Sequence, residues 1–103
     1  MKKFYGGIFM DKEALRKMGI TYPIKLEYYK IEEKVEAGDG SEIYGVEVIK
    51  TEYKNEETNI ESAVVNHVSY DETAANQILE ILKANQVTPV TTQDVLNDLL
   101  FCS

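Results

Sequence analysis

The chain has 103 residues, which is enough for a single domain with a modest hydrophobic core. Its 44% hydrophobic and 28% charged residues are typical of a globular protein and argue against a wholly disordered chain. The formal net charge of −7 argues against nucleic-acid binding and against attachment to anionic lipid, because both need a basic surface.

The N-terminus resembles a signal peptide only briefly. An apolar run follows Lys2 and Lys3, but the charged residues 11–13 end it before it reaches the length of a signal-peptide core. No run approaches the roughly 20 apolar residues of a membrane span. The single cysteine, Cys102, has no partner for an internal disulfide. We therefore expect a cytoplasmic protein.

The single domain, 1–103, divides into an N-terminal segment (1–23), a β-meander (24–68) and a helical pair (69–101). In the first segment, Asp11 is an N-cap candidate and Gly19 a helix terminator, so residues 11–18 are predicted to form about two helical turns. Pro23 then favours extended backbone before it, which lets a strand begin at Ile24.

Alternating apolar residues predict three strands, at about 24–35, 42–53 and 60–68. Turn signals separate them at 38–41 and 54–59. The prediction is therefore a three-stranded antiparallel meander. The face expected to carry the helices consists of Ile24, Leu26, Tyr44, Val46 and Val64.

The period changes to that of a helix after residue 68. Ser69 and Glu72 fit a capping box, and apolar residues at helical spacing continue to about Ala84. Thr91 and Asp94 fit a second box, which predicts a last helix from Thr91 onward. The expected fold class is α+β, with two C-terminal helices on one face of the meander and a short N-terminal helical segment.

Motifs for catalysis and cofactor binding are missing from the sequence. His67 and Cys102 are the only histidine and cysteine, and Cys102 lies near the chain end, where a reactive geometry is difficult to hold. With one histidine and one cysteine, a metal site would have to be built mainly from carboxylates, and no calcium loop occurs. We therefore assign no catalytic, cofactor-binding or metal-binding residues.

Two segments resemble a family of small bacterial proteins of unknown function. One is the strand Tyr44-Gly45-Val46-Glu47, and the other is the C-terminal stretch Pro89-Val90-Thr91 followed by Asp94-Val95-Leu96-Asn97-Asp98. The resemblance covers about residues 42–101. It supports the fold and implies no activity, substrate or catalytic residue.

The second face of the predicted meander is not wholly polar. Odd-numbered apolar residues share it with glutamates, and we expect them to form an interface: Tyr29, Ile31, Ile43, Ile49 and Val65. A second copy of the chain is the expected occupant. The alternative is a monomer in which the N-terminal segment covers this face with Phe9, Leu15 and Met18.

The function expected from these observations is a non-enzymatic protein-interaction or regulatory module that acts as a homodimer or binds another protein. Seven tyrosines and no tryptophan indicate packing at the edge of the core first and a recognition surface second, because tyrosine is favoured both in strands and in interfaces. A small-molecule-binding or enzymatic domain, with a site between sheet and helices, is the alternative. An acidic mimic of nucleic acid is a third hypothesis, which would need the carboxylates in a row.

Overall fold

The sheet has four antiparallel strands in the order β1-β2-β3-β4, so each strand pairs with its neighbour in the chain. They are β1 (Lys2–Met10), β2 (Ile24–Lys34), β3 (Glu42–Tyr53) and β4 (Thr58–Ser69). The computed structural model describes residues 1–35 and 41–101, with the side chain of residue 101 excepted. The turn predicted at 38–41 lies almost wholly outside the described residues.

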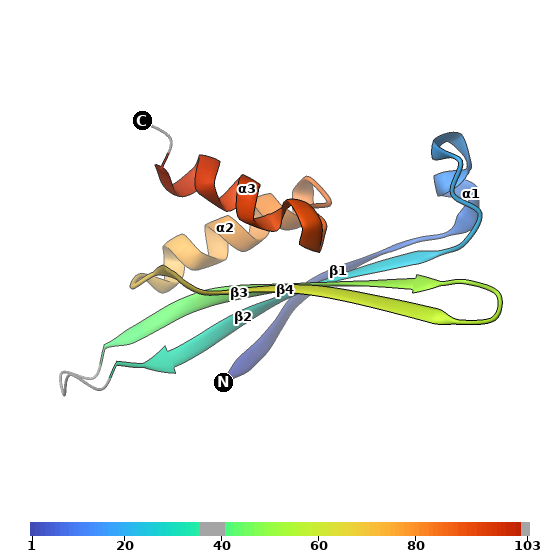
Figure 1. Ribbon diagram of the computed structural model, residues 1–103. Helices are drawn as coiled ribbons and strands as arrows, with labels where there is room; N and C mark the ends of the chain where they lie inside the picture. The colour runs from blue at the N-terminus through green and yellow to red at the C-terminus, as the bar shows by residue number, and fades with distance from the viewer. Residues whose placement is uncertain (36–40, 102–103) are drawn as a thin grey trace.

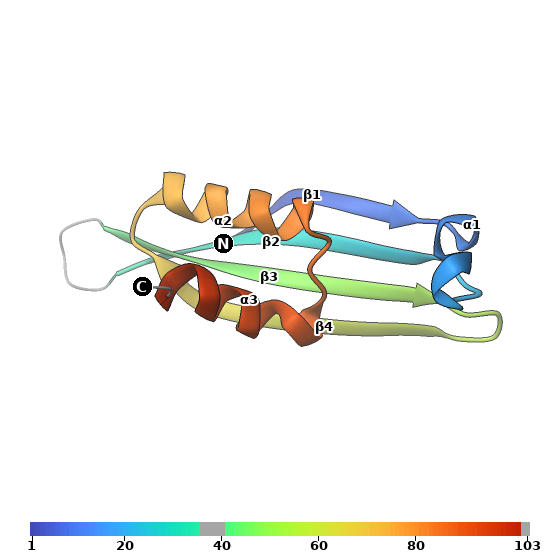
Figure 2. The ribbon, with the colours of Figure 1, turned by 90° about the horizontal axis from the view of Figure 1, so that it is seen from above.

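The helices lie on one side of the sheet. Figure 2 shows α2 (Glu72–Ala84) along β1 and β2, and α3 (Pro89–Phe101) along β3 and β4. The short α1 (Lys12–Leu15) and the 3₁₀ turn η1 (Arg16–Met18) rise from the far end of the sheet on the same side (Figure 1). The molecule therefore has two layers, and no described helix covers the opposite sheet face.

The α+β class and the two C-terminal helices are confirmed, but the sheet has four strands where three were predicted. The additional strand is β1, which pairs with β2 from Lys2 opposite Ile31 to Met10 opposite Ile24. Its two glycines hid it from the sequence pattern, since glycine is depleted in strands. The N-terminal strand thus widens the sheet instead of covering its second face.

The helix starts follow local hydrogen bonding, and two of them differ from the prediction. Asp11 caps α1 as expected, with its carboxylate accepting a 2.9 Å bond from the Ala14 amide. Asp71, not Ser69, caps α2, and the Ser69 hydroxyl instead accepts from the Asp71 amide. The last helix, α3, begins at Pro89, two residues before Thr91. Proline is favoured at the first position of a helix, which explains this start.

The core lies between the helix pair and the near face of the sheet. Its fully buried members come from both layers: Leu26, Tyr28, Val46, Val48, Ala75, Leu79, Leu82 and Leu96. Even-numbered residues of β2 and β3 point into this core, as predicted for Ile24, Leu26, Tyr44 and Val46.

The prediction for β4 is wrong by one residue. Val65 lies opposite Val46 and packs against the core, whereas Val64 lies opposite Glu47 on the other face. A bulge beside Gly45 then shifts the register, which brings Val68 back into the core. Gly45 is required there because an added Cβ atom would lie 2.4 Å from the Val65 carbonyl oxygen.

Candidate interaction surface

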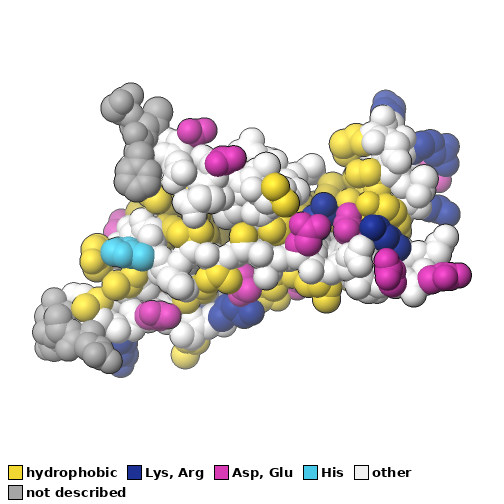
Figure 3. Space-filling view, in the orientation of Figure 1, with side chains coloured by type: hydrophobic (Ala, Val, Ile, Leu, Met, Phe, Trp, Pro, Cys, Tyr) yellow, Lys and Arg dark blue, Asp and Glu magenta, His cyan; other side chains and the backbone are white. Residues whose placement is uncertain are grey.

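The sheet face that points away from the helices is the candidate functional surface, and we call it the bare face. The strand register assigns nine large apolar residues to it: Phe4, Phe9, Tyr29, Ile31, Ile43, Ile49, Tyr53, Ile60 and Val64. Figure 3 shows hydrophobic side chains projecting below the sheet, interspersed with charged ones. The face therefore combines a broad apolar surface with a few charges.

An aromatic and charged cluster occupies the part of the bare face nearest the N-terminus. The Phe4 and Tyr29 rings meet edge to face with centroids 5.5 Å apart, and the Lys2 ammonium lies 4.6 Å from the Tyr29 ring centroid. Lys2 also forms a 2.9 Å ion pair with Glu47. Strand pairing sets this arrangement, because Phe4, Tyr29 and Glu47 lie opposite one another on adjacent strands.

The charges of this cluster are matched within the chain. The Tyr29 hydroxyl donates a 2.9 Å bond to Glu27, and this bond raises the Tyr29 pKa. The hydrogen bond to Glu47 similarly raises the Lys2 pKa. Lys25 lies 3.6 Å from the Glu27 carboxylate. Paired charges of this kind lower the desolvation cost of covering the face.

The opposite end of the bare face is more apolar and more exposed. The Phe9 and Tyr53 rings lie 6.4 Å apart, and Phe9 is 62% exposed. Ile60 of β4 lies at this end and is 67% exposed, whereas Val64, which is 47% exposed, lies opposite Glu47. Large apolar side chains exposed together on one face are typical of an interaction surface.

The structure brings together four of the five residues predicted for the interface. Tyr29, Ile31, Ile43 and Ile49 lie on the bare face. Val65 does not, because it faces the helices, and Val64 takes its place. The prediction placed the odd-numbered residues of all strands on the same face. The turn between two strands sets their register, however, so odd-numbered residues of one strand can share a face with even-numbered residues of the next.

Besides Val64, sequence reasoning missed four exposed members of the surface, Phe4, Phe9, Tyr53 and Ile60. Phe4 and Phe9 were missed because β1 was not predicted as a strand. Ile60 was missed because Val64, which has the same parity, was assigned to the helix-bearing face. Phe4 and Phe9 lie on the same face although one number is even and the other odd, because a bulge lies between Phe4 and Gly6. Strict alternation in the sequence therefore does not place them together.

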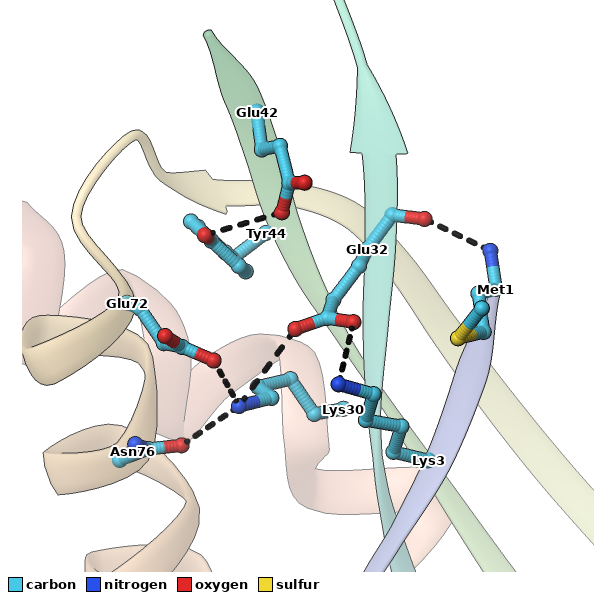
Figure 4. A network of polar contacts seen from close by, with 8 residues as sticks. All are labelled: Met1, Lys3, Lys30, Glu32, Glu42, Tyr44, Glu72 and Asn76. Carbon is cyan, nitrogen blue, oxygen red and sulfur yellow. Dashed lines mark hydrogen bonds and ion pairs between the residues drawn. The ribbon is translucent and has the colours of Figure 1, made fainter.

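A polar network on the helix side is the main alternative site (Figure 4). The Lys30 ammonium contacts Glu72 at 2.5 Å, Asn76 at 3.3 Å and Glu32 at 3.7 Å. Lys3 binds the other side of Glu32 at 3.0 Å. The network ties the first turn of α2 to β2, and its members satisfy one another, which favours a structural role.

Two of the hollows on the described surface bear on the question of a ligand site. One, of about 450 Å³, is lined by Met1 and four charged residues, Glu32, Glu33, Lys34 and Glu42. The other, of about 260 Å³, lies between η1 and the α2–α3 connection, where Figure 3 shows the surface dipping between the helix pair and α1. Its lining includes the apolar residues Met10, Leu15, Met18, Ile20 and Ile24.

His67 is exposed and packs edge to face on Tyr70, with the ring centroids 4.8 Å apart. Cys102 lies outside the described residues. Within residues 1–35 and 41–101, no three His, Cys, Asp or Glu side chains gather in a way that suits a metal ion. None of the described helices is long and apolar enough to cross a membrane.

Comparison with known protein families identifies the family of this chain. The model of a protein family of unknown function matches residues 11–101. The chain belongs to this family, DUF6514. Membership in a family of unknown function was expected from the sequence and is confirmed. The DUF6514 match contains β2, β3, β4 and both long helices, whereas β1, with Phe4 and Phe9, precedes it. No curated protein matches the chain, and no solved structure matches it.

Proposed function

We propose that this protein is a non-enzymatic interaction module that forms a homodimer through its bare face. The observation that carries the proposal is the exposure of Phe4, Phe9, Ile60 and Val64 on a sheet face over which no described helix lies. Sheets with one helix-covered face ordinarily present a polar second face to water. A second sheet packed against this one would remove these side chains from water.

The size of the bare face suits a dimer. Twelve residues at about 3.3 Å each, and four strands at about 4.8 Å, give a footprint of roughly 40 × 19 Å, or about 760 Å². A stable interface of standard size covers about 800 Å² on each partner. The whole face is therefore needed, which favours a partner as broad and flat as the face itself.

The charge on the bare face favours a second copy as that partner. The face has two lysines, Lys2 and Lys25, and three glutamates, Glu27, Glu33 and Glu47, a net charge of −1. The chain as a whole has a net charge of −7. Two copies therefore meet with little repulsion on this face, and a two-fold axis lets each lysine lie near a glutamate of the other copy.

The alternative function, a small-molecule or enzymatic domain, has weaker support. The apolar hollow near η1 measures about 260 Å³, below the roughly 300–1,000 Å³ usual for ligand pockets. The larger hollow is lined mainly by charged side chains, unlike a typical apolar ligand site. The polar groups around Lys30 are already paired with one another.

Sedimentation equilibrium at micromolar concentration tests the proposal. We expect twice the 11.7 kDa mass of one chain, and a species of 11.7 kDa would contradict the homodimer. Ile31→Glu introduces a charge on the bare face, on the inner strand β2, and is expected to give the monomer. Gln77→Glu adds the same charge at an exposed position of α2 and should leave the dimer intact.

A second variant guards against misfolding of Ile31→Glu. Phe4 is 59% exposed, so Phe4→Glu is expected to preserve the fold, as judged by its circular dichroism spectrum. A folded Phe4→Glu protein that sediments as a dimer would show that this face is not the interface.

A further inference from the structure

The two edges of the sheet differ in how they are protected. β1 has Lys2 and Lys3 at one end and a bulge between Phe4 and Gly6. Lysines and bulges are devices that prevent an edge strand from pairing with another chain. The first seven residues of β4, Thr58–Val64, have one charged residue, Glu61, and contain no lysine, proline or register shift. The β4 edge is thus unprotected over this segment.

The same segment projects beyond the helices. In Figure 2, α3 overlies the later part of β4, and the first part of the strand extends past the start of α3. Glu61 and Ser62 are exposed, and Ile60 is 67% exposed. Among the described residues, β4 has a strand neighbour on one side only, which is β3. At the first part of β4, an incoming strand therefore meets this edge beyond the start of α3.

We propose that the 60–64 part of this segment pairs antiparallel with the same residues of a second copy, with Ser62 opposite Ser62. In this register, Ile60 of each copy lies opposite Val64 of the other, and both side chains are on the bare face. Glu61 lies opposite Ala63 of the other copy, so the two glutamates are not opposed. Cross-strand pairs of β-branched residues stabilise a sheet, and opposed like charges destabilise it.

Registers shifted by one residue fit less well than the pairing centred on Ser62. Centring the pairing on Glu61 places two carboxylates directly opposite each other. Centring it on Ala63 places Ile60 opposite Asn66 and loses the apolar pair. The Ser62-centred pairing joins two four-stranded sheets into one of eight strands and makes their bare faces continuous. It uses the edge rather than the face, so it does not depend on the proposed homodimer. Pairing along this short segment covers far less than the roughly 800 Å² on each partner of a stable interface, so it is a transient contact that oxidation traps and that leaves the sedimenting mass at micromolar concentration unchanged.

Cysteine trapping tests this alignment. In a Cys102→Ser background, Ser62→Cys supplies the only thiol of the chain, at an exposed position where the substitution is small. Directly opposed residues have Cβ atoms about 4.5–5.5 Å apart, and disulfides need Cα atoms within about 4.4–6.8 Å. We expect mild oxidation at micromolar concentration to give a disulfide-linked dimer on a non-reducing gel.

Two matched variants control for random collision. Glu61→Cys moves the thiol by one residue, where the proposed register separates the two copies diagonally by about 7–8 Å. Gln77→Cys places it on α2, away from the edge. We expect Ser62→Cys to cross-link at least about tenfold faster than either, because only its geometry satisfies a disulfide without backbone movement. Equal cross-linking rates for the three variants would overturn the proposal. They would favour a different protein as the source of any strand that pairs with this edge.

Combining the trap with Ile31→Glu separates this proposal from the homodimer. If Ile31→Glu abolishes the sedimenting dimer and the Ser62→Cys cross-link persists, both the face and the edge act as proposed. If Ile31→Glu abolishes the dimer and Ser62→Cys shows no preferential cross-link, the homodimer through the bare face is supported and the pairing of β4 edges is overturned. If the wild type sediments as a monomer and the Ser62→Cys variant still cross-links preferentially, the homodimer through the bare face is overturned and the pairing of β4 edges is supported.

Discussion

The Tyr28 hydroxyl donates a 2.8 Å hydrogen bond to the carbonyl oxygen of Val87, joining β2 to the connection between α2 and α3. The two residues are 59 positions apart in the chain, and the bond is buried. It satisfies the one polar group of a fully buried ring and fixes the point at which the chain turns from α2 toward α3.

Tyr28→Phe is expected to destabilise the protein by about 1–3 kcal/mol, because the buried Val87 carbonyl loses its partner. Urea denaturation followed by circular dichroism measures the change. Tyr53→Phe is the matched control at a tyrosine that is 36% exposed, and it should change the unfolding free energy by less than about 0.5 kcal/mol. Equal effects from the two variants would contradict the role of the buried bond.

Stability should fall at alkaline pH. Burial raises the pKa of Tyr28 to about 12, and burial together with the hydrogen bond to Glu42 raises that of Tyr44 to about 12. The folded state thus holds these protons more tightly than the unfolded chain, whose tyrosines titrate near 10. The stabilisation is complete below about pH 10 and is lost as the pH rises through 12. Urea midpoints measured from pH 8 to 12 test this, and the decline should be shallower in Tyr28→Phe.

Gly45→Ala is expected to destabilise the protein by at least about 1–3 kcal/mol, the usual effect of overpacking. The added methyl group would lie 2.4 Å from the Val65 carbonyl oxygen, so the bulge between β3 and β4 must open. Gly7→Ala is the control within another strand, where the nearest atom would lie 3.1 Å away. Thermal melts should rank Gly45→Ala as clearly the less stable of the two.

Two leucines of α3 should differ in their effect on stability. Leu96 is fully buried, and Leu96→Ala is expected to cost about 2–5 kcal/mol. Leu99 is 39% exposed, so Leu99→Ala should cost less than about half as much. If denaturant melts show equal losses, α3 docks in a different rotation about its axis.

The ion pair between Lys30 and Glu72 should support the fold at neutral pH and less so in acid. The hydrogen bond from Lys30 lowers the pKa of Glu72 below its usual value. This stabilisation is therefore present above the pKa of an unfolded glutamate, near 4.3, and is lost as the pH falls below it. Lys30→Met should flatten the decrease in unfolding free energy between about pH 5 and 3. An unchanged acid profile in the variant would contradict this coupling.

The sequence predicted local structure well wherever a single segment determines it. The period-two alternation of β2 and β3 identified the core face, and Asp11 and Gly19 marked the ends of the first helical turns. Exact helix starts were less accurate. Ser69 and Asp71 are both good caps, and only the path of the chain out of β4 decides between them.

Features that depend on two segments at once were not predictable in this way. β1 contains Gly6 and Gly7 and becomes a strand only because β2 offers it an edge. The placement of Val64 and Val65 depends on the register between β3 and β4, which the intervening turn and the Gly45 bulge set together. Most of the bare face was predicted on β2 and β3, and its errors lie on the two edge strands.

The chain order of the elements has a consequence for synthesis on the ribosome. All four strands precede α2 and α3, and each strand pairs with the one made just before it. The meander is therefore assembled from contacts close in sequence, which favours early formation. Until residues 72–101 leave the exit tunnel, both sides of the nascent sheet are open to water, including Leu26, Val46 and Val48. During this interval a chaperone that recognises apolar strands has both sheet faces to bind, whereas α2 and α3 cover one of them in the finished chain.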